Sequence, residues 1–168
     1  MEQTKTLLLN ERQIEQRIKR IAYEIYEDNF DEFEIVIAGI ANAGFVFAKR
    51  LEKAINTICD LKTQLVKLSL DKENPVLHSL EPAIANEALK NKVVIVVDDV
   101  LNSGKTLMYS LRAFLEADIK KIRTVLLVNR DHKRYPVEAD FVGITLSTTL
   151  QEHVTVNLEH GKESVYLS

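Results

Sequence analysis

Two adjacent aspartates, Asp98 and Asp99, follow a run of β-branched residues, Val93–Val97. A run of this kind is typical of a strand buried on both faces in a parallel sheet. The aspartates are expected at the end of this strand, and ligands of open α/β sheets bind at that edge. The next loop, Asn102–Thr106, offers backbone N–H groups and two hydroxyls at a helix start, which suit a phosphate. Carboxylates for sugar hydroxyls or a metal, beside a phosphate-binding loop, predict a sugar-phosphate site.

The loop also contains Ser103-Gly104-Lys105-Thr106, which matches the end of a nucleotide-triphosphatase P-loop. That pattern needs a glycine five residues before Gly104, where this chain has Asp99. Because a carboxylate there would repel a triphosphate, the P-loop interpretation fails. A solvated strand end is the simple alternative for the two aspartates, although it does not account for the loop. Mg²⁺ dehydrates reluctantly, so Asp98 and Asp99 would hold it through water.

Strand patterns alternate with helical patterns along the chain as far as Val128. This alternation predicts a parallel sheet flanked by helices on both faces. Shorter strand patterns beyond Val128 predict a small antiparallel addition. We therefore expect a single α/β domain over residues 1–168, with the polar 71–91 segment as a candidate flexible lid. The expected strands are 34–40, 63–70, 93–97 and 122–128 in the main sheet and 139–145, 153–158 and 164–167 beyond it.

Composition narrows the class of protein. The 168 residues are 46% hydrophobic, which is enough for the core of one domain. A net charge of −3 argues against a protein that holds nucleic acid by bulk charge alone. Cys59 is the only cysteine, so neither a disulfide framework nor a thiolate zinc site is expected. Without an apolar run of membrane-spanning length or a signal-peptide core, we expect a cytoplasmic protein.

A family resemblance rests on these same residues. Val93–Leu107 resembles the motif that binds 5-phosphoribosyl pyrophosphate (PRPP) in type I phosphoribosyltransferases: an apolar strand, two acidic residues, two apolar residues and a loop ending in Gly-x-Thr. Three further segments, Asn10–Glu24, Ile37–Leu51 and Leu127–Gly143, are similar to the pyrimidine operon attenuator/uracil phosphoribosyltransferase family and follow that family's order. Together they cover most of the chain, so the resemblance implies the type I phosphoribosyltransferase fold.

The resemblance also implies an activity, which is Mg²⁺-dependent transfer of ribose 5-phosphate from PRPP to a nucleobase, uracil, with release of pyrophosphate. Asp98 and Asp99 would be catalytic and would hold the ribose hydroxyls with Mg²⁺ nearby. Arg130 and His132 would lie near the base. The 5-phosphate would be bound by Asn102, Ser103, Gly104, Lys105 and Thr106, and the pyrophosphate by Ala41, Asn42, Ala43 and Gly44. Relatives of this kind form homodimers or larger homo-oligomers.

The chain departs from the family pattern at three positions. The pyrophosphate loop usually carries a basic residue where this chain has Ala43, and such a residue would neutralise the leaving group. In the flexible arm, Lys72 would replace an arginine but lacks its planar fork. Asn102 stands where purine-using relatives have a carboxylate that serves as a base. Because an amide cannot remove a proton, a 6-oxopurine substrate is disfavoured.

The first expected helix carries basic residues at Arg17, Lys19 and Arg20, in the region where the family's RNA-binding surface partly lies. Glutamates are interleaved with them, so an ordinary solvated helix face is the competing interpretation. The alternative function is therefore an RNA-binding regulator that uses the PRPP site as a nucleotide sensor, with weak or no catalysis.

Overall fold

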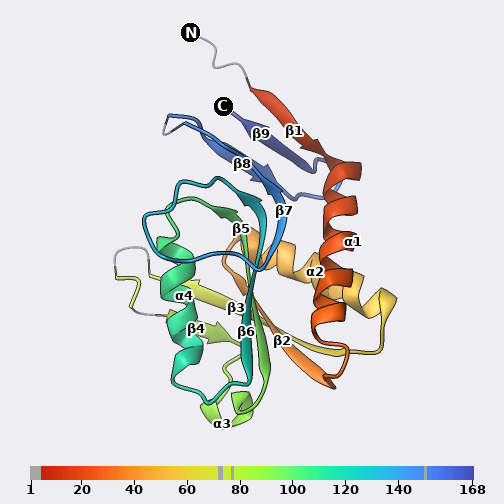
Figure 1. The fold of residues 1–168 in the computed structure, drawn as a ribbon, viewed down its shortest axis with the longest axis vertical. Coiled ribbons are helices and arrows are strands. Elements are labelled where there is room, and N and C mark those ends of the chain that lie inside the picture. Colours follow the sequence, from red (N-terminus) through yellow and green to blue (C-terminus); the bar gives the residue numbers. More distant parts are fainter. Residues whose placement is uncertain (1–4, 72–73, 77, 150) are drawn as a thin grey trace.

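A computed structural model describes residues 5–71, 74–76, 78–149 and 151–168 (Figure 1). Lys72, predicted to replace the arginine of the flexible arm, lies outside the described residues. The elements in chain order are β1 (Thr6–Asn10), α1 (Glu11–Asp28), β2 (Glu34–Ile40), α2 (Ala43–Ile58), β3 (Lys62–Leu70), β4 (His78–Glu81), α3 (Asn86–Leu89), β5 (Val93–Leu101), α4 (Lys105–Leu115), β6 (Lys121–Asn129), β7 (Phe141–Thr145), β8 (Val154–Asn157) and β9 (Ser164–Leu167).

The main sheet has six strands in the order β4-β3-β2-β5-β6-β7. Its strands from β3 to β7 are parallel, and β4 pairs antiparallel with β3 at the edge. The β-branched run Val93–Val97 lies in β5, near the middle of the sheet, and is fully buried. This confirms the predicted parallel sheet, because only a strand covered on both faces needs apolar side chains at every position.

Helices cover both faces of this sheet (Figure 1). On one face, α1 and α2 pack on β2, β3, β5 and β7, and on the other face α4 packs on β3, β4 and β5. Alternate residues of β5 serve the two sides: Val93, Ile95 and Val97 pack with α1 and α2, while Val94 and Val96 pack with α4. The period-two alternation of a strand therefore supplies both hydrophobic cores.

A second sheet of three antiparallel strands has the order β1-β9-β8 and lies over the carboxyl ends of the main strands (Figure 1). The predicted strands at 153–158 and 164–167 form part of it as β8 and β9. The strand predicted at 139–145 is instead β7, which joins the main sheet parallel to β6. Its place in the small sheet is taken by β1, which was not predicted because its five residues contain three successive leucines and no alternation.

The 71–91 segment has more regular structure than a polar excursion. β4 pairs with β3 in a register that sets Glu81 beside Lys67, and Leu89 of α3 is fully buried beneath the α4 side of the sheet. β4 and α3 thereby attach part of this segment to the domain, and a lid over 71–91 stays a prediction.

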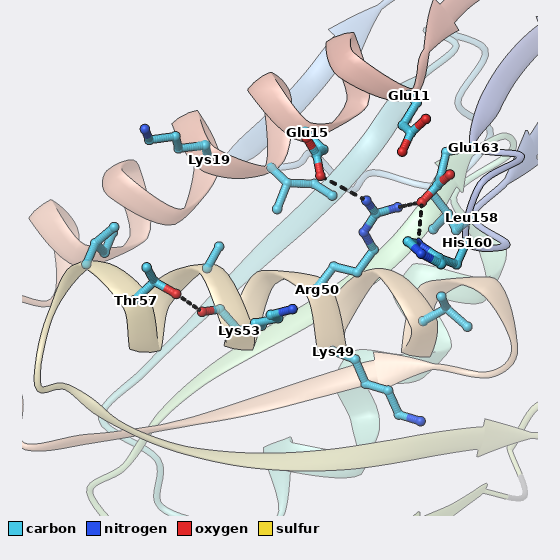
Figure 2. Close-up of a pocket in the computed structure, with 14 residues that line it drawn as sticks. Glu11, Glu15, Lys19, Lys49, Arg50, Lys53, Thr57, Leu158, His160 and Glu163 are labelled. Carbon is cyan, nitrogen blue, oxygen red and sulfur yellow. Dashed lines mark hydrogen bonds and ion pairs between the residues drawn. The ribbon is translucent and has the colours of Figure 1, made fainter.

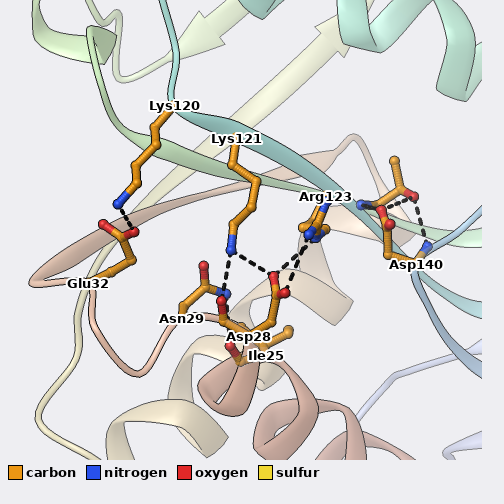
Figure 3. A network of polar contacts seen from close by, with 9 residues as sticks. Ile25, Asp28, Asn29, Glu32, Lys120, Lys121, Arg123 and Asp140 are labelled. Carbon is orange, nitrogen blue, oxygen red and sulfur yellow. Dashed lines mark hydrogen bonds and ion pairs between the residues drawn. The ribbon is translucent and has the colours of Figure 1, made fainter.

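Polar contacts fasten the end of α1 to the start of β6, at the amino edge of the sheet (Figure 3). Asp28 accepts hydrogen bonds from Lys121 Nζ at 2.9 Å and from Arg123 Nε at 3.0 Å, and Lys120 pairs with Glu32 next to them. Burial works against ionisation of Asp28, but the hydrogen bonds and charges of Arg123 and Lys121 hold its pKa below the ordinary value. This network lies at the end of the sheet opposite the aspartate pair.

Within the described parts of the chain, no helix combines the length and apolarity needed to cross a bilayer.

Candidate functional site

The two aspartates of the predicted site lie in β5 rather than after it. β5 continues to Leu101, and it pairs with β6 as far as Leu101 beside Asn129. This corrects the prediction that the strand ends at the aspartates, because a run of apolar residues does not mark where hydrogen bonding stops. Asp98 and Asp99 are half-buried, and Asp98 Oδ1 accepts a hydrogen bond from Asp99 N at 2.9 Å.

Burial raises the pKa of Asp98 well above its ordinary value, and the neighbouring charge of Asp99 raises it further. A cation beside the pair would oppose this rise in pKa, because it favours the ionised carboxylates. Carboxylate oxygens are ligands that Mg²⁺ accepts, and it normally keeps several waters. Among the described residues, no group of three or more His, Cys, Asp or Glu side chains is placed to hold a metal. The pair therefore fits a Mg²⁺ ion held through water and substrate better than one held in a protein cage.

The predicted pyrophosphate loop, Ala41–Gly44, lies directly against Asp98. A Cβ added to Gly44 would come within 2.9 Å of Asp98 Cα, Asp98 Oδ1 and Val97 O, so only glycine allows this approach. The loop follows β2, its Ala41–Asn42 peptide is cis, and Ala41 N donates to Leu68 O of β3 at 2.9 Å. α2 begins at Ala43, and no side chain caps its first turn through Asn42. The first turn of α2 therefore lies at the edge that holds the aspartates.

The predicted 5-phosphate loop connects β5 to α4. Gly104 precedes the helix with φ at +83°, a left-handed conformation that favours glycine. Ser103 Oγ accepts a hydrogen bond from Lys105 N at 3.3 Å. The carbonyl of Ser103 accepts from Arg134 N at 2.8 Å and from Tyr135 N at 3.1 Å, so the segment after β6 braces the loop. Asn102, Lys105 and Thr106 are exposed, which leaves their side chains open to solvent.

Arg130, predicted to lie near the base, is buried, and each of its three guanidinium nitrogens donates to a protein group. Its Nε donates to Thr148 Oγ1 at 3.1 Å and its Nη1 to Asn102 Oδ1 at 2.8 Å. Its Nη2 donates to the carbonyls of Thr149 and Glu152. The guanidinium thus joins the 5-phosphate loop to the segment that leads into β8, and its place near a base stays a prediction. Sequence reasoning missed this joining role because its partners are separated by up to 28 residues.

His132, the second residue predicted near the base, is half-buried and its Nε2 is hydrogen-bonded to Thr148 O. Arg130 and His132 therefore meet at Thr148, a buried residue that sequence reasoning did not single out. Only its place in the polar run Ser147-Thr148-Thr149 offered a signal, and such runs are typical of any loop.

The three basic residues predicted for RNA have different surroundings on α1. Arg20 donates to Glu24 Oε1 at 2.7 Å and to the carbonyls of Val142 and Gly143 at 2.8 and 2.9 Å, so it ties α1 to β7. Arg17 is half-buried, whereas Lys19 is exposed. Of the three, Lys19 is therefore the side chain most available to a partner.

A cavity of about 680 Å³ lies between α1 and α2, beside the turn from β8 to β9 (Figure 2). Arg50 crosses it, with Nη1 3.4 Å from Glu163 Oε1 and Nη2 4.0 Å from Glu15 Oε1. Its lining includes neither aspartate of the pair nor any residue of the 5-phosphate loop. The cavity is therefore separate from the predicted site.

Comparison with known proteins agrees with this geometry. Residues 5–160 match the model of the phosphoribosyl transferase domain. The chain therefore belongs to the phosphoribosyl transferase domain family, as the PRPP-motif resemblance predicted.

Within this family, two relatives share the name bifunctional protein PyrR. A bifunctional protein PyrR from Clostridium novyi is 35% identical over 90% of this chain and 89% of its own. Another from Macrococcus caseolyticus is 30% identical over 97% of this chain and 98% of its own. Among solved structures, a hypoxanthine-guanine phosphoribosyltransferase from Bacillus anthracis superposes with a TM-score of 0.70 at 25% identity, over 83% of this chain and 81% of its own. The hypoxanthine phosphoribosyltransferase of Trypanosoma cruzi shares the fold, with a TM-score of 0.79 over 96% and 95% of the two chains at 16% identity.

Proposed function

We propose that this protein transfers ribose 5-phosphate from PRPP to a nucleobase and releases pyrophosphate. One observation carries the proposal: Gly44 packs on Asp98 so closely that the pyrophosphate loop and the aspartate pair share one edge of the sheet. The 5-phosphate loop begins at that edge too, directly after β5. Three elements suited to the three parts of PRPP thus converge, and family membership supports the same chemistry.

Each element has a task in this reaction. Asp98 and Asp99 would hold the ribose hydroxyls. Ser103 and Thr106 would add hydroxyl donors to the backbone N–H groups around the 5-phosphate. Positive charge develops at the sugar carbon as the pyrophosphate leaves, as in glycosidic cleavage, so the protein must position both partners and exclude water. Bound Mg²⁺ would neutralise charge on the departing pyrophosphate.

Uracil is the proposed base, since the sequence resembles the pyrimidine operon attenuator/uracil phosphoribosyltransferase family. Asn102 supports this choice, because its amide cannot serve as the base that a 6-oxopurine requires. Ala43 leaves the pyrophosphate loop without a side-chain cation, so we expect slow turnover and retained PRPP binding.

Several further properties accompany the proposal. Residues 1–168 would act as one domain, and the 71–91 segment would serve as the lid over bound substrate. Assembly into a homodimer or larger homo-oligomer is proposed from the resemblance. A role in nucleotide salvage or pyrimidine regulation would place the protein in the cytoplasm, where nucleotides are made.

The decisive experiment incubates the protein with PRPP, Mg²⁺ and a panel of bases and measures pyrophosphate release. We expect release with uracil, little with hypoxanthine or guanine, and none from the Asp98→Asn/Asp99→Asn variant. If wild type and variant are equally inactive with every base, the transferase proposal is wrong.

A second candidate function is an RNA-binding regulator that senses nucleotides at the PRPP site. The uncharged pyrophosphate loop favours it, and so does the exposed Lys19 on α1. RNA binding should weaken as salt rises and should be lost in Lys19→Glu. Arg17→Glu with Arg20→Glu is a less clean test, because Arg20 also anchors β7. Absence of RNA binding at low salt would exclude this function.

A further inference from the structure

The pair Asn102 and Arg130 fixes the hydrogen-bonding character of the 5-phosphate loop. The two residues follow β5 and β6 directly, at the positions where the paired strands end, and Arg130 N donates to Leu101 O at 3.2 Å. Arg130 is 8% exposed, whereas Asn102 is exposed. The contact between them, 2.8 Å from Nη1 to Oδ1, therefore joins a buried cation to a side chain that faces solvent.

The identity of Arg130 determines which way the Asn102 amide points. A guanidinium has N–H donors and no acceptor, so the amide atom that faces it must be the oxygen. The amide nitrogen then points the opposite way. No acceptor for Nδ2 is found in the described parts of the chain, while Oδ1 is already engaged. Asn102 thus presents two free N–H groups at the entrance of the loop.

Arg130 itself cannot easily turn away. Its Nε and Nη2 are held by Thr148, Thr149 and Glu152, all in the segment before β8. A buried guanidinium that lost these acceptors would be left uncompensated, at a high cost in free energy. The orientation of Asn102 is therefore imposed by a rigid group rather than chosen freely in solvent.

We infer that Asn102 binds an unprotonated oxygen of the ligand, and that Arg130 is the positioning residue that keeps Asn102 a donor. This inference rests on the proposed function and adds a polarity rule to it: the ligand atom at Asn102 is a phosphoryl or a carbonyl oxygen, not an N–H group. A carboxylate at this position would also be held by Arg130, through one oxygen. Its other oxygen would then face the ligand as an acceptor, so the ligand atom at this position would have to be an N–H group.

The test uses Asn102→Asp, which has nearly the same shape but exchanges the donor for an acceptor. Arg130 keeps its partner, so the melting temperature should not fall below that of the wild type. Ligand binding should weaken about a hundredfold, and in Asn102→Ala, which only removes the donor, about tenfold. Measurements at low and high salt separate charge repulsion, which salt screens, from loss of the donor, which salt leaves unchanged.

Two measurements on the Asn102 variants identify the ligand atom. A raised dissociation constant for PRPP with Mg²⁺ assigns Asn102 to a phosphoryl oxygen, and a raised KM for uracil alone assigns it to a carbonyl oxygen. Arg130→Lys should raise whichever constant, the dissociation constant for PRPP or the KM for uracil, Asn102→Ala raises. The double variant Asn102→Ala/Arg130→Lys should bind that ligand no more weakly than Arg130→Lys alone. Additive losses would contradict the positioning role of Arg130.

The inference and the proposed function fail in different ways. If transfer occurs with uracil and neither constant responds to Asn102→Asp at high salt, the inference is wrong and the function stands. A melting temperature for Asn102→Asp below that of Asn102→Ala would also refute it, since Arg130 would then not hold this side chain. If no base is ribosylated but PRPP binding responds as expected, the transferase proposal is wrong and the inference stands.

Discussion

Replacing Gly44 by alanine tests whether the pyrophosphate loop and the aspartate pair are built as one unit. The new Cβ would lie 2.9 Å from Asp98 Cα, Asp98 Oδ1 and Val97 O. Two of these atoms belong to the backbone of β5, which is held between β2 and β6 and cannot move aside. The start of α2 must therefore move away from Asp98, which separates two parts of the site.

The sign of the change in stability shows whether helix propensity or overpacking dominates in Gly44→Ala. Gly44 lies in α2, and helix propensity alone predicts that alanine stabilises the protein by about 1 kcal/mol. Overpacking against fixed backbone costs about 1–3 kcal/mol and outweighs that gain. We expect a net loss of about 1 kcal/mol, which for a chain of 168 residues lowers the melting temperature by roughly 2–4 °C.

Thermal unfolding followed by circular dichroism, together with titration of PRPP in the presence of Mg²⁺, measures both consequences. Gly161→Ala is the control. Gly161 has φ at +79° and nothing within 4 Å of an added Cβ, so its substitution costs only the left-handed conformation, about 1–2 kcal/mol, and leaves PRPP binding unchanged. A Gly44→Ala protein that is as stable as the wild type and binds PRPP equally well would refute the close packing on Asp98.

Three further predictions concern charge. A raised pKa means that folded Asp98 keeps its proton when the unfolded chain has lost it, so its contribution to stability falls as pH rises from about 3.8 through the raised pKa. Asp98→Asn should therefore be more stable than the wild type near neutral pH in EDTA and equal to it below pH 3.8, and parallel melting curves would contradict this. Asp28 has a lowered pKa, so its stabilising effect is present above pH 3.8 and is lost as pH falls through the lowered pKa of the folded state. Asp28→Asn should therefore reduce the free energy of unfolding by about 1 kcal/mol at neutral pH, measured by urea unfolding. No loss would show that the network does not stabilise the fold. Ala43→Arg should raise kcat/KM for PRPP about tenfold in the pyrophosphate-release assay, because it places a cation beside the leaving group, and an unchanged value would argue against Ala43 facing the pyrophosphate.

The central strand and the loop after it could be predicted from sequence because their signals are local. Val93–Val97 admits few alternatives to a doubly covered strand, and Gly104 before Lys105 marks a helix start. The end of β5 was misplaced since a hydrogen-bonding ladder depends on the partner strand. Asp98 is still paired with Leu126 of β6 through its backbone, and the pairing continues at Val100 and Leu101, although the aspartate side chains are polar.

The rest of the site depends on contacts between distant segments. The family resemblance places Arg130 near the base, but it gave no sign of the hydrogen bonds to Thr148, Thr149 and Glu152, which lie up to 22 residues further on. β1 was missed for a related reason, because its pairing partner β9 lies at the opposite end of the chain. Periodicity carries no information about such partners.

The order of strands in the small sheet has a consequence for how the protein is made. β9 lies between β1 and β8 although it follows both of them in the chain. During synthesis, β1 emerges first and β8 follows, but neither can pair until residues 164–167 have left the ribosome. The main sheet, whose strands end at Thr145, can form earlier. The cover over the carboxyl edge is therefore the last part of this domain to assemble, and a nascent chain stalled before Ser164 would expose the aspartate pair without it.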